Sequence, residues 1–308
     1  MEKIEEYTTD QFIARDFLKE LNSFVRINIL GQKDNDKLFE KDGAIYKMEY
    51  PINTAYIEKS ANKINEIYEK YLKNKSMNVY YAIIPDKNYY LEDDDHLKPN
   101  YMELKKIMNN NLQNLEYIDI WDCLKLEDYY KTDLHWRQEK LYKVVNRLEE
   151  KMKLQTTHAN EYNIVDEGEF FGTYYGQLGK NVEPDKLYTL TNYEIEGCKT
   201  YNFENKETGK IYYYKQTADR YDIFLSGATP LISIENPNAN SKKELLLFRD
   251  SFGSSIAPLL VKNYSKITLI DIRYISSKIL TQYLEFENQD VLFLYSIPIL
   301  NQNIFNIY

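Results

Sequence analysis

Helix-type and strand-type segments alternate in the first and the last third of the chain, and this alternation constrains the fold most. Apolar residues three or four positions apart predict helices at 9–30, 53–74, 101–113, 136–152, 255–264 and 276–285. Short β-rich runs predict a strand after Gly43 and buried strands at 78–85, 116–122, 244–249, 267–272 and 290–297. This order is typical of an α/β sheet with helices on both faces.

Residues 155–240 have a different character, with clustered aromatic residues in "FFGTYYGQLG" and "KIYYYKQ" and a turn-rich "ENPNANS". We interpret this segment as a β-rich insertion in a single domain that spans residues 1–308. A chain of 308 residues with 43% hydrophobic content is large enough to bury a core of that size.

The composition argues against several classes of partner. A formal net charge of −9 is opposite to what binding of a nucleic-acid backbone or an anionic lipid surface requires. No window approaches the roughly 18 consecutive apolar residues of a membrane span, and the charged start "MEKIEEYTTD" is unlike a signal peptide. A role outside the cell would therefore need an export segment that this sequence lacks. Cys123 and Cys198 leave the redox compartment and their own pairing open.

A serine follows the strand predicted at 244–249, in "LLLFRDSFGSS". Ligands of open α/β sheets bind at the carboxyl ends of the strands, where a serine in a strand-to-helix turn can hold an oxyanion with its own backbone N–H. Gly253 lets this backbone turn tightly and approach a ligand. Ser251 is therefore a candidate nucleophile, and an ordinary cap or turn serine is the alternative.

The segment "TDLHW" places Asp133 two residues before His135 and Trp136 directly after it. In an extended segment such side chains point to one side, about 6.6 Å apart, so the carboxylate can bind one imidazole nitrogen and leave the other free. A serine nucleophile needs this arrangement. The pair lies between the strand at 116–122 and the next helix, on the same sheet edge as Ser251. Trp136 either packs on the imidazole or stacks on a sugar.

A metal site is the rival interpretation of the histidines. The acidic run Asp93, Asp94 and Asp95 with His96 offers ligands but favours a solvated loop, and His158 lies in a polar stretch that favours the surface. We therefore expect neither a metal nor a cofactor.

Several blocks in order resemble the DHHW family, bacterial extracytoplasmic relatives of the alginate O-acetylation proteins within the SGNH hydrolase superfamily. The blocks are "FVRINILGQKDNDKLFEKDGAIYKM", "VYYAIIPDKNYYL", "DYYKTDLHW", "YDIFLSGATPLISIENPNA", "LLLFRDSFGSSIAPLL" and "ITLIDIRY". The resemblance implies a three-layer α/β/α fold with a mostly parallel sheet. It also implies a triad of Asp133, His135 and Ser251, in an order permuted relative to ordinary SGNH esterases, where the serine comes first. Leu134 stands where the family name has its second histidine.

The resemblance further implies that Arg273, in "DIRY", holds an oxyanion or the substrate; a salt bridge with Asp271 or Asp250 is the alternative. The implied function is extracytoplasmic O-acetylation of a cell-surface or secreted polysaccharide through an acyl-serine, with a membrane-bound O-acyltransferase as the donor partner. Two alternatives stay open: a carbohydrate acetylesterase that uses the same triad, and a polysaccharide-binding scaffold with an inactive triad.

Overall fold

The computed structural model describes residues 34, 36–92, 95–178, 182–214, 217, 219–239 and 241–303. The helix predicted at 9–30 lies outside these residues. The strands are β1 (Leu38–Lys41), β2 (Ala44–Lys47), β3 (Val79–Ile84), β4 (Glu116–Tyr117), β5 (Asn163–Phe170), β6 (Asp185–Thr191), β7 (Lys199–Asn202), β8 (Glu207–Gly209), β9 (Leu231–Glu235), β10 (Glu244–Arg249), β11 (Lys266–Ile270) and β12 (Asp290–Ser296).

The α-helices are α3 (Thr54–Ile67), α4 (Tyr101–Asn111), α5 (Tyr142–Lys151), α6 (Thr173–Leu178), α7 (Tyr193–Gly197), α8 (Phe252–Ile256) and α9 (Ile297–Leu300), and a π-helical turn (Tyr68–Leu72) extends α3. Short 3-10 helices span Lys87–Tyr89, Trp121–Cys123, Leu126–Asp128, Gln138–Lys140, Ala159–Glu161, Arg220–Ile223, Ala257–Asn263 and Ser277–Gln282. Asn53 and Asn100 cap α3 and α4, each by accepting a backbone N–H of the first turn.

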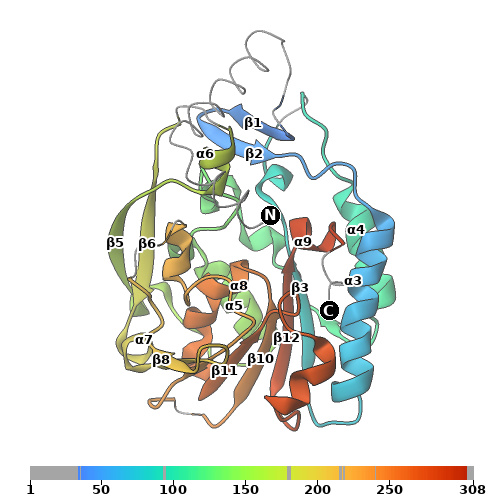
Figure 1. Cartoon of the computed structure of the whole chain (residues 1–308), viewed down its shortest axis with the longest axis vertical. Coiled ribbons are helices and arrows are strands. Elements are labelled where there is room, and N and C mark those ends of the chain that lie inside the picture. The colour runs from blue at the N-terminus through green and yellow to red at the C-terminus, as the bar shows by residue number, and fades with distance from the viewer. Residues whose placement is uncertain are drawn as a thin grey trace, which may run out of the picture.

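An eight-stranded sheet forms the centre of the molecule, in the order β4-β3-β12-β10-β11-β9-β7-β8. The strands from β4 to β11 run parallel, and β9, β7 and β8 continue the sheet antiparallel. Helices α3 and α4 cover one face and α5 and α8 the other (Figure 1). All residues of β12 and nearly all of β10 are buried, as strands covered on both faces should be. The predicted three-layer fold and mostly parallel sheet are therefore confirmed.

The strand predicted after Gly43 does not join this sheet. Strand β2 pairs antiparallel with β1 in a hairpin of its own, through a turn in which Asp42 and Gly43 both have positive φ. The strand predicted at 116–122 is also shorter, because the Asp119 side chain accepts the Trp121 N–H and begins a 3-10 turn. The hydrophobic periodicity of the sequence predicted neither the pairing of β2 with β1 nor the 3-10 turn at Trp121–Cys123.

The segment 155–240 is built partly into the main sheet. Strands β7, β8 and β9 form its antiparallel end, whereas β5 and β6 form a separate two-stranded sheet beside it (Figure 1). Within the part of the chain that the structure describes, no helix is both long and apolar enough to cross a lipid bilayer.

The parallel strands bring distant parts of the sequence to one sheet edge. Asp86 and Lys87 follow β3, Ser251 follows β10, and Asp271 follows β11. Carboxyl ends of parallel strands are where sites in open α/β sheets form. The polar side chains described next all gather at this edge.

Candidate active site

Ser251 lies in the turn that joins β10 to α8. The buried Asp250 fixes this turn: one carboxylate oxygen accepts the Phe252 N–H at 3.0 Å, and the other accepts the Ser296 N–H of β12 at 2.7 Å. Ser251 itself is partly exposed. Its own N–H donates none of the hydrogen bonds found among the described residues, so it is available to an oxyanion.

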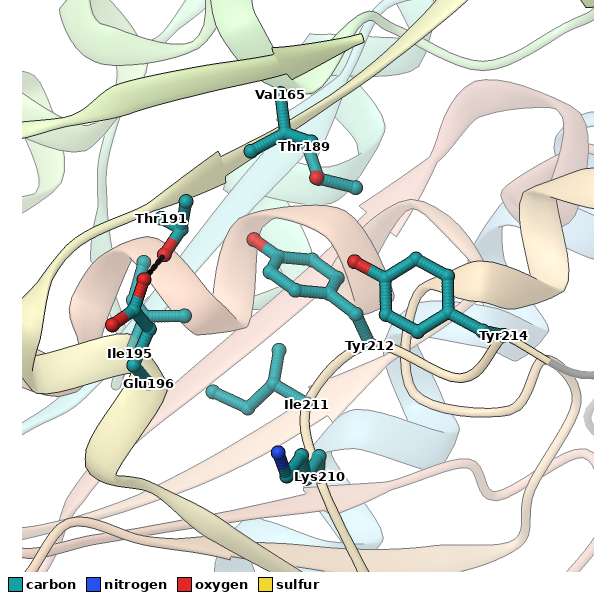
Figure 2. Close-up of a pocket in the computed structure, with 9 residues that line it drawn as sticks. All are labelled: Val165, Thr189, Thr191, Ile195, Glu196, Lys210, Ile211, Tyr212 and Tyr214. Atoms are coloured by element: carbon teal, nitrogen blue, oxygen red, sulfur yellow. Dashed lines mark hydrogen bonds between the residues drawn. The ribbon is translucent and has the colours of Figure 1, made fainter. Parts of the chain in front are cut away.

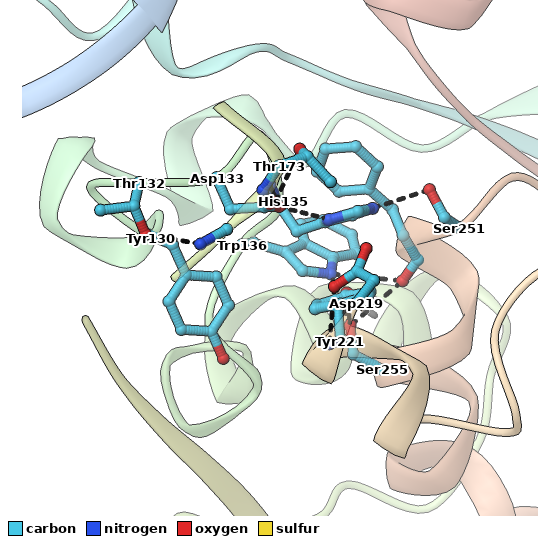
Figure 3. Close-up of polar contacts among 12 residues, drawn as sticks. Tyr130, Thr132, Asp133, His135, Trp136, Thr173, Asp219, Tyr221, Ser251 and Ser255 are labelled. Atoms are coloured by element: carbon cyan, nitrogen blue, oxygen red, sulfur yellow. Dashed lines mark hydrogen bonds and ion pairs between the residues drawn. The ribbon is translucent and has the colours of Figure 1, made fainter. Parts of the chain in front are cut away.

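Asp133, His135 and Ser251 form one chain of hydrogen bonds (Figure 3). Asp133 Oδ1 lies 2.5 Å from His135 Nδ1, and His135 Nε2 lies 2.7 Å from Ser251 Oγ. Asp133 is fully buried and His135 is 4% exposed, so solvent competes little for these contacts. The arrangement can remove a proton from the serine hydroxyl.

The aspartate reaches the imidazole through a bent loop, which corrects the extended segment expected from the sequence. Residues 131–135 are bends, and the loop is closed by the Tyr130 N–H, which donates to the His135 carbonyl at 3.1 Å. Asp133 Oδ1 also accepts the His135 backbone N–H at 2.9 Å. One carboxylate oxygen therefore fixes both the backbone and the ring of His135.

The other oxygen of Asp133 binds Thr173, at the start of α6. Its partners are the Thr173 N–H at 2.7 Å and the Thr173 hydroxyl at 2.9 Å. Burial opposes ionisation, but the charge of His135 and the hydrogen bonds from His135 and Thr173 outweigh it and hold the pKa of Asp133 well below its usual value. Gly172 permits this approach, since a Cβ there would lie 2.2 Å from the Asp133 Cβ.

Aromatic rings fix the plane of the imidazole. Tyr221 stacks on His135 with ring centroids 3.8 Å apart and an interplanar angle of 8°, and Phe252 lies 4.7 Å away. The Tyr221 hydroxyl donates to Ser255 Oγ at 2.8 Å, which ties the ring to α8 (Figure 3).

Of the two roles left open for Trp136, packing and stacking on a sugar, the structure shows packing. Its indole is fully buried, packs edge-on against Phe252, and donates to Ser255 Oγ at 2.9 Å. It therefore belongs to the packing beneath α8.

Gly253 packs closely against Arg249. A Cβ there would lie 2.5 Å from the Arg249 Cβ, and the Gly253 N–H donates to the Asp250 carbonyl in the tight turn expected from the sequence. Approach of this backbone to a ligand stays a prediction.

Arg273 forms a two-point ion pair with Asp271, at 2.8 and 2.6 Å, and the fully buried Arg249 lies 3.7 Å from the same carboxylate. The sequence left two roles open for Arg273, a salt bridge and contact with an oxyanion or the substrate. The structure shows the salt bridge with Asp271, and contact with substrate stays a prediction.

None of the remaining candidates that the structure describes has a recorded contact with the triad. Asp93 and Asp94 are outside the described residues, His96 stacks on Phe39, and His158 is exposed. No group of three or more metal-binding side chains occurs in the residues that the structure describes. Cys123 and Cys198 are buried and unpaired with each other.

A pocket of ≈ 490 Å³ opens between β5, β6, α7 and the segment 210–214 (Figure 2). Its lining includes Tyr212, Tyr214, Glu196 and Lys210. Tyr214 is 70% exposed, whereas the Tyr212 hydroxyl donates to the Gln138 side chain at 3.1 Å. The "KIYYYKQ" run thus supplies one exposed aromatic face to this pocket.

Sequence reasoning missed Thr173, Tyr221 and Lys87. Tyr221 is the first residue of the "YDIFLSGATP" block, and Lys87 follows the predicted strand at 78–85 in "AIIPDK". Each could therefore have been considered from a pattern that the sequence analysis had already identified. No pattern in the sequence indicated Thr173, because its contact with Asp133 arises only from the packing of α6.

Comparison with known proteins agrees with this architecture. A family model described as DHHW protein matches residues 44–270. A comparison with curated proteins found no match.

Solved structures share the fold at low sequence identity. A crystal structure of a DHHW family protein from Eubacterium siraeum has a TM-score of 0.71 at 21% identity, covering 85% of this chain and 91% of that one. Bacillus cereus PatB1 with a sulfonyl adduct has a TM-score of 0.71 at 22% identity, covering 89% and 99%. The O-acetyltransferase domain of Pseudomonas putida AlgJ has a TM-score of 0.53 at 11% identity, covering 85% and 91%. The chain therefore shares its fold with these proteins.

Proposed function

The chain belongs to the DHHW family, and we propose that it is an O-acetyltransferase that acetylates a polysaccharide through an acyl-serine at Ser251. The observation that carries the proposal is the hydrogen-bond chain from Asp133 through His135 to Ser251. Two relatives are consistent with it: AlgJ is described as having an O-acetyltransferase domain, and PatB1 carries a sulfonyl adduct, the product expected when a nucleophile meets a sulfonylating reagent.

In the first half-reaction, Ser251 Oγ attacks the carbonyl carbon of the acetyl donor. His135 Nε2 takes the hydroxyl proton, and Asp133 stabilises the imidazolium. The Ser251 N–H, which donates to no other described residue, is the donor that we assign to the oxygen that becomes negative. When the tetrahedral intermediate collapses, the bond to the donor oxygen breaks and that oxygen takes the proton from His135, which leaves acetyl-Ser251.

In the second half-reaction, a sugar hydroxyl attacks the acetyl carbon while His135 takes its proton. The bond to Ser251 Oγ breaks, and His135 returns the proton to the serine. Water in place of the sugar gives hydrolysis, so the outcome depends on how well the acceptor is oriented. None of the residues that line the ≈ 490 Å³ pocket belongs to the triad, so we treat this pocket as a candidate surface for a part of the polysaccharide away from the reacting hydroxyl, with the exposed face of Tyr214 as its stacking surface.

The setting of the reaction follows from the same proposal. We place the protein outside the cytoplasm, with a membrane-bound O-acyltransferase as the source of acetyl groups. We also treat the chain as one domain, because β7, β8 and β9 of segment 155–240 continue the main sheet.

The test is mass spectrometry of surface-type oligosaccharides incubated with 4-nitrophenyl acetate and protein. We expect acetylated oligosaccharide with the wild type and none with Ser251→Ala. Ser254→Ala is the matched control, because this serine lies three residues after Ser251 in α8, is buried, and has no hydrogen-bond partner for its hydroxyl among the described residues. It should acetylate as the wild type does.

The alternatives give distinct outcomes. Free acetate that depends on Ser251, with no acetylated sugar from any glycan, would favour an acetylesterase. Glycan binding without turnover of any donor would favour a polysaccharide-binding scaffold.

A further inference from the structure

A buried lysine contacts the loop that carries the triad aspartate and histidine. Lys87 begins the 3-10 helix that follows β3, and it is only 3% exposed. Its Nζ donates to the carbonyl oxygens of Tyr130 at 2.9 Å, Lys131 at 3.2 Å and Asp133 at 2.8 Å. All three acceptors lie in the loop whose side chains act on Ser251.

The number of acceptors matches the protonated form of the lysine. An ammonium group has three N–H donors, and here three carbonyls receive them, whereas a neutral amine has only two. The cation also lies 5.1 Å from the ring centroid of Tyr46 and 5.3 Å from that of Tyr174. A buried charge is costly without such partners. Lys87 can therefore bind all three carbonyl groups of the loop only in its protonated form.

A carboxylate also binds this loop. Asp185 accepts the N–H groups of Lys131 and Thr132, both at 2.8 Å, and the Thr132 hydroxyl at 2.6 Å. Lys87 thus binds carbonyl groups and Asp185 binds N–H groups of the same short stretch. A bent loop outside any sheet or helix has few hydrogen bonds of its own, so these two side chains supply much of what fixes its backbone.

We propose that Lys87 is a positioning residue, which holds the 130–133 backbone so that Asp133 and His135 stay aligned with Ser251. It touches no reacting atom. Its contact with the Asp133 carbonyl acts on the same residue whose carboxylate orients the imidazole. The effect on turnover rests on the proposed function, but the effect on the Asp133–His135 hydrogen bond does not.

Lys87 makes this alignment sensitive to pH. The charged groups that face it are Asp86, Asp133 and Asp185, and burial outweighs their attraction and lowers the pKa of Lys87 to about 7. As the pH rises past this value, the amine keeps only two donors for three carbonyls. Alignment should therefore weaken on the alkaline side.

The test compares Lys87→Met with the wild type on 4-nitrophenyl acetate. A misplacement of order 1 Å costs about 100-fold in rate, so we expect kcat to fall about 100-fold with little change in KM. Wild-type kcat should decline as the pH rises through about 7, because Lys87 loses its proton there, and Lys87→Met should lack that decline. The control is Lys105→Met: this lysine is also largely buried, lies 3.7 Å over the Trp121 ring, and contacts no residue of the loop. It should keep the wild-type profile.

The titration of Asp86 must be distinguished from that of Lys87, because burial raises the pKa of the neighbouring Asp86 carboxyl to about 7 as well. Asp86→Asn should keep the alkaline decline but shift it to lower pH, because the Asp86 charge favours the protonated form of Lys87. If the decline disappeared in Asp86→Asn and persisted in Lys87→Met, Asp86 would be the titrating group and the proposal would be overturned.

A second readout needs no turnover. The low-field proton resonance of the short Asp133–His135 hydrogen bond should be present in the wild type and in Lys105→Met, and broadened or lost in Lys87→Met. Lys87→Met with both an unchanged resonance and wild-type kcat would refute the positioning role. A resonance that changes as expected in a protein with no esterase activity would support it and would refute the proposed function alone.

Discussion

Replacing Asp133 with asparagine separates the role of its charge from that of its shape. The carboxylate receives four donors: the His135 ring and backbone N–H on one oxygen, and the Thr173 N–H and hydroxyl on the other. An amide has a single oxygen, so its NH₂ must face one of these pairs. A buried donor left unpaired in this way costs about 1–3 kcal/mol of folding stability.

Either orientation of the amide impairs catalysis. If the NH₂ faces His135, the imidazole must carry its proton on Nε2 and cannot accept the Ser251 proton; if it faces Thr173, the imidazolium still loses its counter-charge. By analogy with other serine triads, we expect kcat to fall about 10⁴-fold, or roughly 5 kcal/mol in activation free energy.

The assay is kcat on 4-nitrophenyl acetate together with denaturant unfolding across the acid pH range. The pKa of Asp133 is lowered by folding, so its contribution to stability is present above its ordinary pKa and is lost as the pH falls towards the folded value. Asp133→Asn should flatten that acid loss.

Asp290→Asn is the matched control for this substitution, since Asp290 is a buried carboxylate that binds Tyr264 and Asn78 at the start of β12, the opposite sheet edge. It should lose stability and keep kcat. Near-normal kcat in Asp133→Asn would refute the assigned role of the carboxylate.

Three further outcomes follow from the same geometry. Ser251→Ala should abolish turnover and leave the melting temperature within a few degrees of the wild type, because a turn hydroxyl contributes little stability; residual wild-type turnover would require another nucleophile. Gly172→Ala should lower both stability and kcat, since its Cβ would displace Asp133, and a fully active variant would show that α6 can shift freely. EDTA should leave turnover unchanged, as measured by ester hydrolysis, and activity lost to EDTA but restored by zinc would reverse our preference for a serine mechanism over a metal.

The sequence was enough to predict the location of a site residue where that residue's position relative to a strand determines its place in the fold. Ser251 follows β10, and strand ends meet at one sheet edge, so its location could be predicted from periodicity alone. The Asp133 and His135 pair could be predicted from its spacing, although the loop proved bent. Strand β2 was misplaced because a short apolar run does not reveal its pairing partner.

The supporting residues could not be predicted in the same way. Tyr221 and Thr173 come from segment 155–240, whose strands and turns have no period that points at the triad. Trp136 is a similar case: the sequence left packing and sugar stacking both open, and only the full burial of its indole decides for packing. Tertiary packing, which the sequence does not display, decides each of these cases.

The acyl-serine is tested most directly by trapping it. Protein mixed with 4-nitrophenyl acetate and quenched in acid is digested, and the peptide that contains Ser251 is analysed by mass spectrometry. The account predicts a single acetyl group on Ser251, formed at the burst rate of nitrophenol release and discharged faster when an acceptor oligosaccharide is added. Turnover with no acetyl group on this peptide, or with acetyl on another side chain at the burst rate, would contradict it.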